Sequence, residues 1–484
     1  MKQPALLSKK DFAYCAISGL LLGISFSSTR VDCGMLAWIA LVPLFIALDN
    51  KPALMRGWLS MFCGFLFFLV TIYWLAHVSV TGLIILCLYL SLYFFVFGLL
   101  KAPRSCLLDL VWIPSAWILL EFLRSSLLTG FGWGLLGYTQ FKNLLLIQSA
   151  ALVGVWGVGF VIVLVNVVIH HWAAGRKNTP GKIAGALGAC VLLLAMHVYG
   201  YACLLQRDYF APDINVSVIQ GNIPQEQKWD PAYRKLTLAT FRALTQKAAQ
   251  DNPGLILWPE TSVPGYVLDE PLLLKSVLSL VKDINTFLLI GSPREDLVKK
   301  RYYNSAFLFD PKGELICVHD KIHLVPFGEY IPFKNLLGFL ETRVADFSAG
   351  KRIKLFTVPN RTGRPVRFAV LICFEDIFPH LVRRFKNAGA DFLVIISNEA
   401  WFKKSAEPRQ HLAMSVFRAV ENRCWFIRCA NTGISCFIDP CGRVVTQVGS
   451  KNKAIFVTGF KTQLLGAGLI RPVLQFDLAG LINN

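Results

Sequence analysis

Long apolar segments in the first 205 residues constrain this chain more than any other feature. Crossing a bilayer takes about 20 apolar residues. The segments of sufficient length are 11–28, 34–50, 57–77, 80–100, 107–127, 144–172 and 183–204. No small-residue cleavage site follows the first segment, so we interpret it as an anchor and not as a removed signal peptide. The sequence therefore predicts a transmembrane domain of about seven helices over residues 1–205.

Basic residues indicate how these helices are oriented. With the N-terminus in the cytoplasm, the opposite loops carry only Arg30, Arg124 and Lys142. The cytoplasmic ends then carry Lys2, Lys9, Lys10, Lys51, Arg56, Lys101, Arg104, Arg176, Lys177 and Lys182. Such an excess of Lys and Arg is typical of cytoplasmic loops. Seven crossings then place the rest of the chain outside, which in a two-membrane bacterium is the periplasmic face of the inner membrane.

The net charge of +19 suits a protein that lies against anionic lipid. The basic residues are scattered along the chain, and the first half is predicted to be membrane-embedded. We therefore expect no nucleic-acid partner.

Charges, prolines and alternating patterns appear from Arg207 onward, and they predict a second domain over residues 206–460. The expected strands are 214–221, 254–260, 286–293, 304–310, 367–375, 391–401, 424–432, 434–440 and 454–460. Amphipathic helical stretches lie between them at 232–250, 271–285 and 408–423. Strands that are apolar on both faces, with helices between them, favour buried sheets covered by helices. The predicted fold class is α/β, beside an α-helical transmembrane bundle.

The last segment, 461–484, is predicted not to cross the membrane fully. Its longest uninterrupted apolar run, Leu464–Ile470, is far shorter than a span, and Arg471, Pro472 and Asp477 follow. We expect the C-terminus to stay outside, with a short interfacial segment as the alternative.

One stretch near the outer ends of the spans is rich in glycine and aromatic residues: "TGFGWGLLGYTQFKN", 129–143. It predicts either a re-entrant or interfacial loop, or an ordinary loop between spans. Glu121 and Arg124 lie about one helical turn apart near it, and we expect them to pair with each other rather than to bind a substrate.

Three segments of the second domain end in reactive side chains. "LILWPE" delivers Glu260, "RFAVLICFE" delivers Cys373, and a loop broken by Pro and Gly carries Lys321, with Glu329 eight residues later. A thiol needs a base to become a thiolate, and acyl transfer needs a cation or N–H group to hold the developing oxyanion. Glu, Lys and Cys supply these groups without a metal. Spacing alone leaves open that Cys373 is a core cysteine and Lys321 a surface charge.

The order of "WPE", "DKIHLVPFGEYIP" and "CFED" resembles the Glu–Lys–Cys arrangement of the nitrilase, or carbon–nitrogen hydrolase, superfamily. With the membrane half, "QGNIPQEQKWDP", "LTGFGWGLLGYTQ", "HLVPFGEYIP" and "SNEAWF" resemble the apolipoprotein N-acyltransferase family over nearly the whole chain. The resemblance implies a nitrilase-like αββα layered sandwich. It also implies acyl transfer from a membrane phospholipid, through a cysteine thioester, to the N-terminal amine of diacylglyceryl-cysteine in apolipoproteins.

By this resemblance Glu260 is the general base, Lys321 the oxyanion stabiliser and Cys373 the nucleophile. The resemblance also assigns supporting or substrate-side roles to Trp229, Glu329, Phe374 and Glu375. Glu375 either shapes the turn after the nucleophile or forms a plain structural salt bridge. No cofactor is implied.

Three features depart from the family pattern. Phe374 stands where the family has tyrosine, so no hydroxyl is available there. Glu399 stands where aspartate is usual. The family ends in an eighth membrane helix, whereas only 24 residues follow Phe460.

The sequence evidence for other functional sites is weaker. A spacing similar to a metal-ligand motif is found at His319, Asp320 and His323. Because Lys321 between them disfavours a cation, we expect no metal. The regularly spaced Cys424, Cys429, Cys436 and Cys441 form no C-x2-C pair, and we interpret them as small apolar residues.

Two other functions remain as alternatives. One is a membrane-anchored nitrilase-type amidase that acts on a small amide. The other is a transporter with an appended domain, which is disfavoured because the spans hold almost no ionisable residues away from their ends.

Overall fold

The computed structural model describes residues 8–26, 32–101, 105–175, 179–205, 214–332, 346–448 and 454–460. Their contacts form two compact units, which we describe separately. The first contains the helices up to Leu205 together with Phe402–Phe417, and the second contains the two β-sheets. The predicted tail, 461–484, lies outside the described residues.

Apolar helices build the first unit. They are α1 (Lys9–Ser25), α2 (Val42–Leu48), α3 (Ala53–Thr71), α4 (Val80–Leu100), α5 (Cys106–Ser126), α6 (Leu144–Ile147), α7 (Ala150–Ala173) and α8 (Thr179–Leu205). Among the described residues, α3, α4, α5, α7 and α8 are long and apolar enough to cross a membrane. The segment expected as one span at 34–50 is instead a 3-10 turn, η1 (Gly34–Trp38), followed by α2. The expected count of seven spans stays a prediction.

Hydroxyl caps fix where several of these helices begin. Ser79 accepts a hydrogen bond from the Gly82 N–H at 3.0 Å, and Ser105 accepts one from the Leu108 N–H at 3.3 Å. Each cap satisfies a backbone donor that has no partner within the helix. Helices α4 and α5 thus each begin at a defined residue.

Several cations that we expect at the cytoplasmic side meet at one end of the helices. Lys51, after α2, pairs with Asp11 in the first turn of α1 at 2.6 Å. Lys101, after α4, pairs with Asp49 after α2 at 3.3 Å. The N-terminal end of α1 and the C-terminal ends of α2 and α4 therefore lie together.

The stretch 129–143 is folded and largely buried. It contains the 3-10 turn η3 (Leu136–Gln140), and its Trp133 is buried. The expected pair of Glu121 and Arg124 is wrong, because each binds the backbone of this stretch instead. Glu121 accepts the Leu136 N–H at 2.9 Å, and Arg124 donates to the carbonyls of Phe131, Trp133 and Gly134. The two charged side chains of α5 hold the loop in place.

The second unit contains two six-stranded sheets. The first has the order β12-β1-β2-β3-β4-β5 and the second β11-β10-β9-β8-β7-β6. Their bounds are β1 (Ile214–Gln220), β2 (Leu255–Leu257), β3 (Phe287–Asp296), β4 (Arg301–Phe309), β5 (Leu315–Asp320), β6 (Leu355–Pro359), β7 (Pro365–Ile372), β8 (Phe392–Ser397), β9 (Phe426–Ala430), β10 (Ser435–Ile438), β11 (Val444–Val448) and β12 (Ala454–Phe460).

The two sheets have the same arrangement of parallel and antiparallel strands. Strands β1, β2 and β3 pair in parallel in one sheet, and β7, β8 and β9 pair in parallel in the other. Antiparallel strands flank each parallel centre. Apolar side chains of both sheets, such as Leu257 and Leu289 from one and Val370 and Ile396 from the other, form one continuous core.

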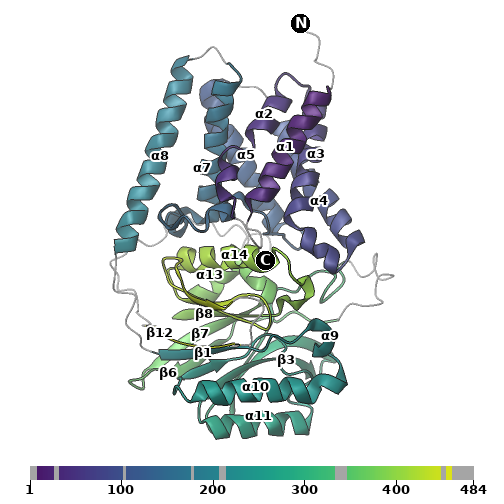
Figure 1. Ribbon diagram of the computed structural model, residues 1–484, viewed down its shortest axis with the longest axis vertical. Coiled ribbons are helices and arrows are strands. Elements are labelled where there is room, and N and C mark those ends of the chain that lie inside the picture. Colours follow the sequence, from purple (N-terminus) through teal and green to yellow (C-terminus); the bar gives the residue numbers. More distant parts are fainter. Residues whose placement is uncertain are drawn as a thin grey trace. The chain divides into compact units, whose positions relative to one another are not determined.

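The helices after Leu205 are α9 (Gln225–Lys228), α10 (Arg234–Ala249), α11 (Pro271–Ile284), α13 (Pro379–Asn387) and α14 (Glu407–Asn422). Of these, α10, α11 and α13 pack on the sheets. Helices α10 and α11 lie side by side on the first sheet (Figure 1) and bury Phe241, Val277 and Leu280 against it. Helix α13 contacts β7 and β8 through Leu381, Val382 and Phe385. The expected αββα layered sandwich is confirmed.

Gly291 on β3 allows the chain after β2 to approach closely. A Cβ at this position would lie 2.6 Å from the Pro259 carbonyl oxygen and 2.8 Å from the Glu260 Cα. Any side chain here would push the Glu260 segment away from the sheet. The glycine therefore sets the position of Glu260.

We predict that Gly291→Ala destabilises the protein by about 1–3 kcal/mol, as overpacking of a core does. The apparent Tm of the full chain in neutral detergent should fall by several degrees. Gly188→Ala in α8 is the control, because nothing lies within 4 Å of its Cβ. Equal Tm values for the two variants would contradict the steric argument.

Candidate active site

The structure brings Glu260 and Lys321 together. Glu260 follows β2 after two further residues, and Lys321 follows β5 directly. The Lys321 Nζ lies 3.9 Å from the Glu260 Oε1, and both side chains are buried. The site is therefore charged and largely shielded from water.

Glu329 is the nearest partner of Lys321. Its two carboxylate oxygens lie 3.0 and 2.8 Å from the Lys321 Nζ. Its Oε2 also accepts the Val325 N–H at 2.8 Å, which holds the loop between the two residues in a closed turn. Burial lowers the pKa of Lys321, but the carboxylates of Glu329 and Glu260 outweigh burial and hold this pKa above its usual range. Lys321 is therefore a fixed positive charge.

Asn304 on β4 connects the two carboxylates, a role that the sequence did not reveal. Its Nδ2 donates to the Glu260 Oε1 at 2.7 Å and to the Glu329 Oε1 at 3.0 Å. Its backbone carbonyl accepts the Lys321 N–H at 2.8 Å. One residue thus aligns all three charged groups.

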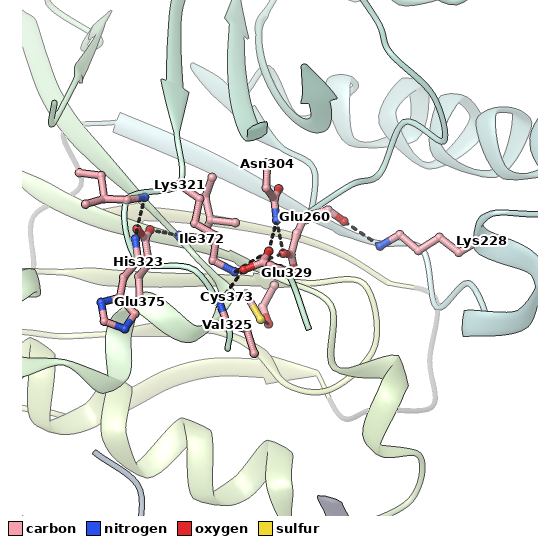
Figure 2. Close-up of polar contacts among 12 residues, drawn as sticks. Lys228, Glu260, Asn304, Lys321, His323, Val325, Glu329, Ile372, Cys373 and Glu375 are labelled. Carbon is pink, nitrogen blue, oxygen red and sulfur yellow. Dashed lines mark hydrogen bonds and ion pairs between the residues drawn. The ribbon is translucent and has the colours of Figure 1, made fainter. Parts of the chain in front are cut away.

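Cys373 follows β7 directly and comes from the other sheet. Its φ of 54° lies in the left-handed region, which residues other than glycine rarely adopt. A nucleophile on a strained turn at the end of a strand is exposed to a substrate. Figure 2 shows its sulfur beside Glu329, Glu260 and the tip of Lys321.

The surroundings of Cys373 keep its thiol protonated at rest. Burial of the sulfur raises its pKa well above the usual range, and the Glu260 carboxylate raises it further. Lys321 acts in the opposite direction, and Ser397 at the end of β8 donates to the sulfur at 3.7 Å. A thiolate must therefore be made by proton transfer when it is needed, and Glu260 is the carboxylate that can accept this proton.

Glu375 shapes the turn. It accepts the Ile372 N–H through one oxygen at 2.7 Å, and the Ile322 and His323 N–H groups through the other at 2.7 and 3.0 Å. Among the described residues it forms no ion pair, so the salt-bridge alternative is wrong. Figure 2 shows Glu375 joining the segment after Lys321 to the segment that carries Cys373.

The remaining sequence candidates lie at the edge of this cluster. Phe374 packs edge-on against Phe378, with ring centroids 5.3 Å apart. Trp229, just after α9, is half exposed at 50% and is free to contact a substrate. His319 packs edge-on against Phe385, and Asp320 pairs with Arg294.

Comparison with known proteins identifies the relatives of this chain. Residues 215–467 match the Carbon-nitrogen hydrolase family, and residues 18–168 match the Apolipoprotein N-acyltransferase N-terminal domain. The Apolipoprotein N-acyltransferase of Geobacter metallireducens is 39% identical over 90% of this chain and 87% of the relative. That of Chlorobaculum tepidum is 32% identical over 90% of this chain and 88% of the relative.

The chain belongs to the apolipoprotein N-acyltransferase family.

Among solved structures, the chain matches the Saccharomyces cerevisiae nitrilase-superfamily protein Nit3 at 21% identity. This match covers 51% of this chain and 90% of that protein, with a TM-score of 0.39.

Lys228 is a buried cation in this acyltransferase that the sequence did not single out. It ends α9, one residue before Trp229, and its Nζ donates to the Glu260 backbone carbonyl at 2.8 Å. Burial lowers its pKa to about 8, although Glu260 and Cys373 favour its charged form. Lys228 therefore joins α9 to the backbone of Glu260 (Figure 2).

Arg428 on β9 binds two further carboxylates near the turn that carries Cys373. Its guanidinium pairs with Asp376 at 3.3 Å and with Glu399. All three side chains are buried. Through Arg428, Asp376 after β7 and Glu399 after β8 are thus held together.

We predict that Lys228→Met stabilises the protein most at neutral pH. The folded-state pKa of about 8 lies below the usual lysine value of about 10.4, so the unfolded chain binds more protons between these values. The contribution of Lys228 to the stability of the parent therefore rises through this range, and the variant lacks this contribution. The Tm of the variant minus that of the parent should fall steadily from pH 7 to pH 10.

The readout is scanning fluorimetry of the full chain in neutral detergent. Lys235→Met on α10 is the matched control, because Lys235 is exposed and its loss should give a difference that does not change with pH. A flat or rising difference for Lys228→Met would contradict the assignment of a lowered pKa.

Proposed function

We propose that this enzyme transfers an acyl chain from a membrane phospholipid, through a thioester on Cys373, to the α-amine of diacylglyceryl-cysteine in apolipoproteins. The observation that carries the proposal is the meeting of Glu260, Lys321 and a strained Cys373 in one buried cluster. Family membership and the apolar helices of the first unit support a lipid substrate. We place the reaction at the periplasmic face of a bacterial inner membrane.

In the first step Glu260 accepts the thiol proton, and the Cys373 sulfur attacks the ester carbonyl carbon. The charge that develops on the carbonyl oxygen is stabilised by Lys321, which stays protonated beside Glu329. The ester C–O bond then breaks, and Glu260 returns its proton to the leaving lysophospholipid oxygen. The products are a thioester on Cys373 and a lysophospholipid.

In the second step the free amine of the apolipoprotein attacks the thioester carbon. Glu260 accepts a proton from the amine, the C–S bond breaks, and the thiolate regains a proton from Glu260. A thioester retains most of the acyl-transfer potential of the ester, so an amide can form without ATP. The same groups therefore serve both half-reactions.

The test uses the purified full chain, phosphatidylethanolamine with a labelled acyl chain, and a synthetic diacylglyceryl-cysteine peptide. We expect label on the peptide that has a free amine, and none on the same peptide with an acetylated amine. Cys373→Ala should transfer no label. Transfer by Cys373→Ala at the parental rate would overturn the proposal, as would hydrolysis of small amides without any acyl transfer.

We predict that Glu260→Gln and Lys321→Met both slow thioester formation, each for a different physical reason. Loss of the base should slow thioester formation about 10²–10⁴-fold. Loss of the cation should slow it about 10²–10³-fold, the scale of one oxyanion donor. The measurement is single-turnover labelling of the protein by labelled phospholipid.

Exposed residues of the same types give the controls: Glu314→Gln and Lys275→Met should label at the parental rate. A folded Glu260→Gln or Lys321→Met protein with near-parental labelling would remove that residue from the mechanism.

A further inference from the structure

A strongly basic cavity lies in the second unit, and the proposed acyl transfer does not use it. Its volume is about 250 Å³. It is lined by Arg294, Lys299, Arg301, Tyr303, Val318, Asp320, Ala349, Gly350, Lys351, Arg352 and Lys354. Six of these residues carry a positive charge, and only Asp320 carries a negative one.

Two of the six cations have partners. Arg294 makes a two-pronged contact with Asp320 at 3.0 and 2.8 Å, and Lys299 pairs with Asp296 at 3.2 Å. Within the described ranges, no carboxylate lies within ion-pairing distance of the other four, which are Arg301, Lys351, Arg352 and Lys354. Cations gathered around one hollow repel each other, and an anion would relieve that repulsion.

The cavity adjoins the backbone beside Lys321, the proposed oxyanion stabiliser. Asp320, in its wall, is the residue before Lys321, and the Gly350 N–H donates to the Lys321 carbonyl at 2.7 Å. A Cβ at Gly350 would lie 2.3 Å from the Asp320 carbonyl oxygen, so the two segments pack backbone against backbone. An occupant of the cavity would therefore touch the same backbone that positions Lys321.

We propose that this cavity binds a phosphate-bearing anion. Guanidinium groups match the oxygens of a phosphate in pairs, and lysines add point charges. A volume of about 250 Å³ lies just below the range of small-molecule pockets, which suits a phosphate with a short substituent and not a large ligand. Neither the geometry nor the charge of the cavity depends on the proposed acyl transfer.

A soluble phosphate ester and a phospholipid headgroup share this chemistry, and the experiment separates them. Binding of three probes to the full chain in neutral detergent is measured by calorimetry at low ionic strength. The probes are inorganic phosphate, glycerol 1-phosphate and dihexanoylphosphatidylglycerol below its micellar concentration. Preference for glycerol 1-phosphate indicates a soluble ligand, and preference for the short-chain lipid indicates a headgroup; either supports the site.

The double variant Arg301→Gln/Arg352→Gln tests whether the cavity is the place of binding. Loss of two charge-assisted contacts should weaken the preferred probe about tenfold or more. The control, Arg361→Gln/Arg364→Gln, removes the same charge from the exposed turn between β6 and β7 and should bind as the parent does.

Absence of binding to the parent, or equal binding by the two double variants, would overturn the proposal. Acyl transfer is assayed separately on the same samples. Failure of the cavity to bind phosphate is therefore distinguished from failure of the proposed function.

Discussion

The buried charge of Lys321 is the interaction on which the site depends. One ammonium group compensates two carboxylates, those of Glu329 and Glu260. Burying any of the three charges alone costs several kcal/mol, so the cluster is stable only when it is complete. Asn304 and the Val325 N–H supply the remaining hydrogen bonds of the carboxylates. The resulting cluster holds the Glu260 carboxylate in a fixed position, where we propose that it accepts the thiol proton.

The two sheets contribute different parts of the candidate site. Glu260 and Lys321, the proposed base and cation, follow strands β2 and β5 of the first sheet, and Cys373, the proposed nucleophile, follows β7 of the second. The site therefore exists only when the sheets pack on each other through their shared apolar core. Glu375 fastens this arrangement, because its carboxylate binds the backbone on both sides, at Ile322 and at Ile372.

Much of this architecture could be predicted from the sequence, because long periodic runs give strong signals. The expected helix at 80–100 corresponds to α4, and the expected strand at 454–460 corresponds to β12. The edge strands β5, β6 and β11 were missed. They are short, and β5 and β11 have few buried side chains, so they lack the apolar pattern of a central strand. Helix α13 was missed because its nine residues, PHLVRRFKN, are mostly polar.

The residues of the site were likewise predicted only in part. Strand ends revealed Glu260 and Cys373, but the supporting contacts of Asn304, Lys228 and Arg428 depend on residues far apart in the chain. No local pattern distinguishes a buried lysine such as Lys228 from the many exposed lysines. Glu121 and Arg124 were predicted to pair from their spacing on α5, whereas backbone groups 7 to 15 residues further along the chain proved to be their partners.

The central claim is that the acyl chain passes through the sulfur of Cys373. The most direct measurement is mass spectrometry of the intact full chain after incubation with phospholipid and without an acceptor, followed by peptide mapping. The account predicts a mass increase of one acyl chain, without glycerol or headgroup, on the peptide that contains Cys373, and its removal by neutral hydroxylamine. An acyl chain found on another residue, or acceptor acylation with no adduct on Cys373 at any time, would contradict it.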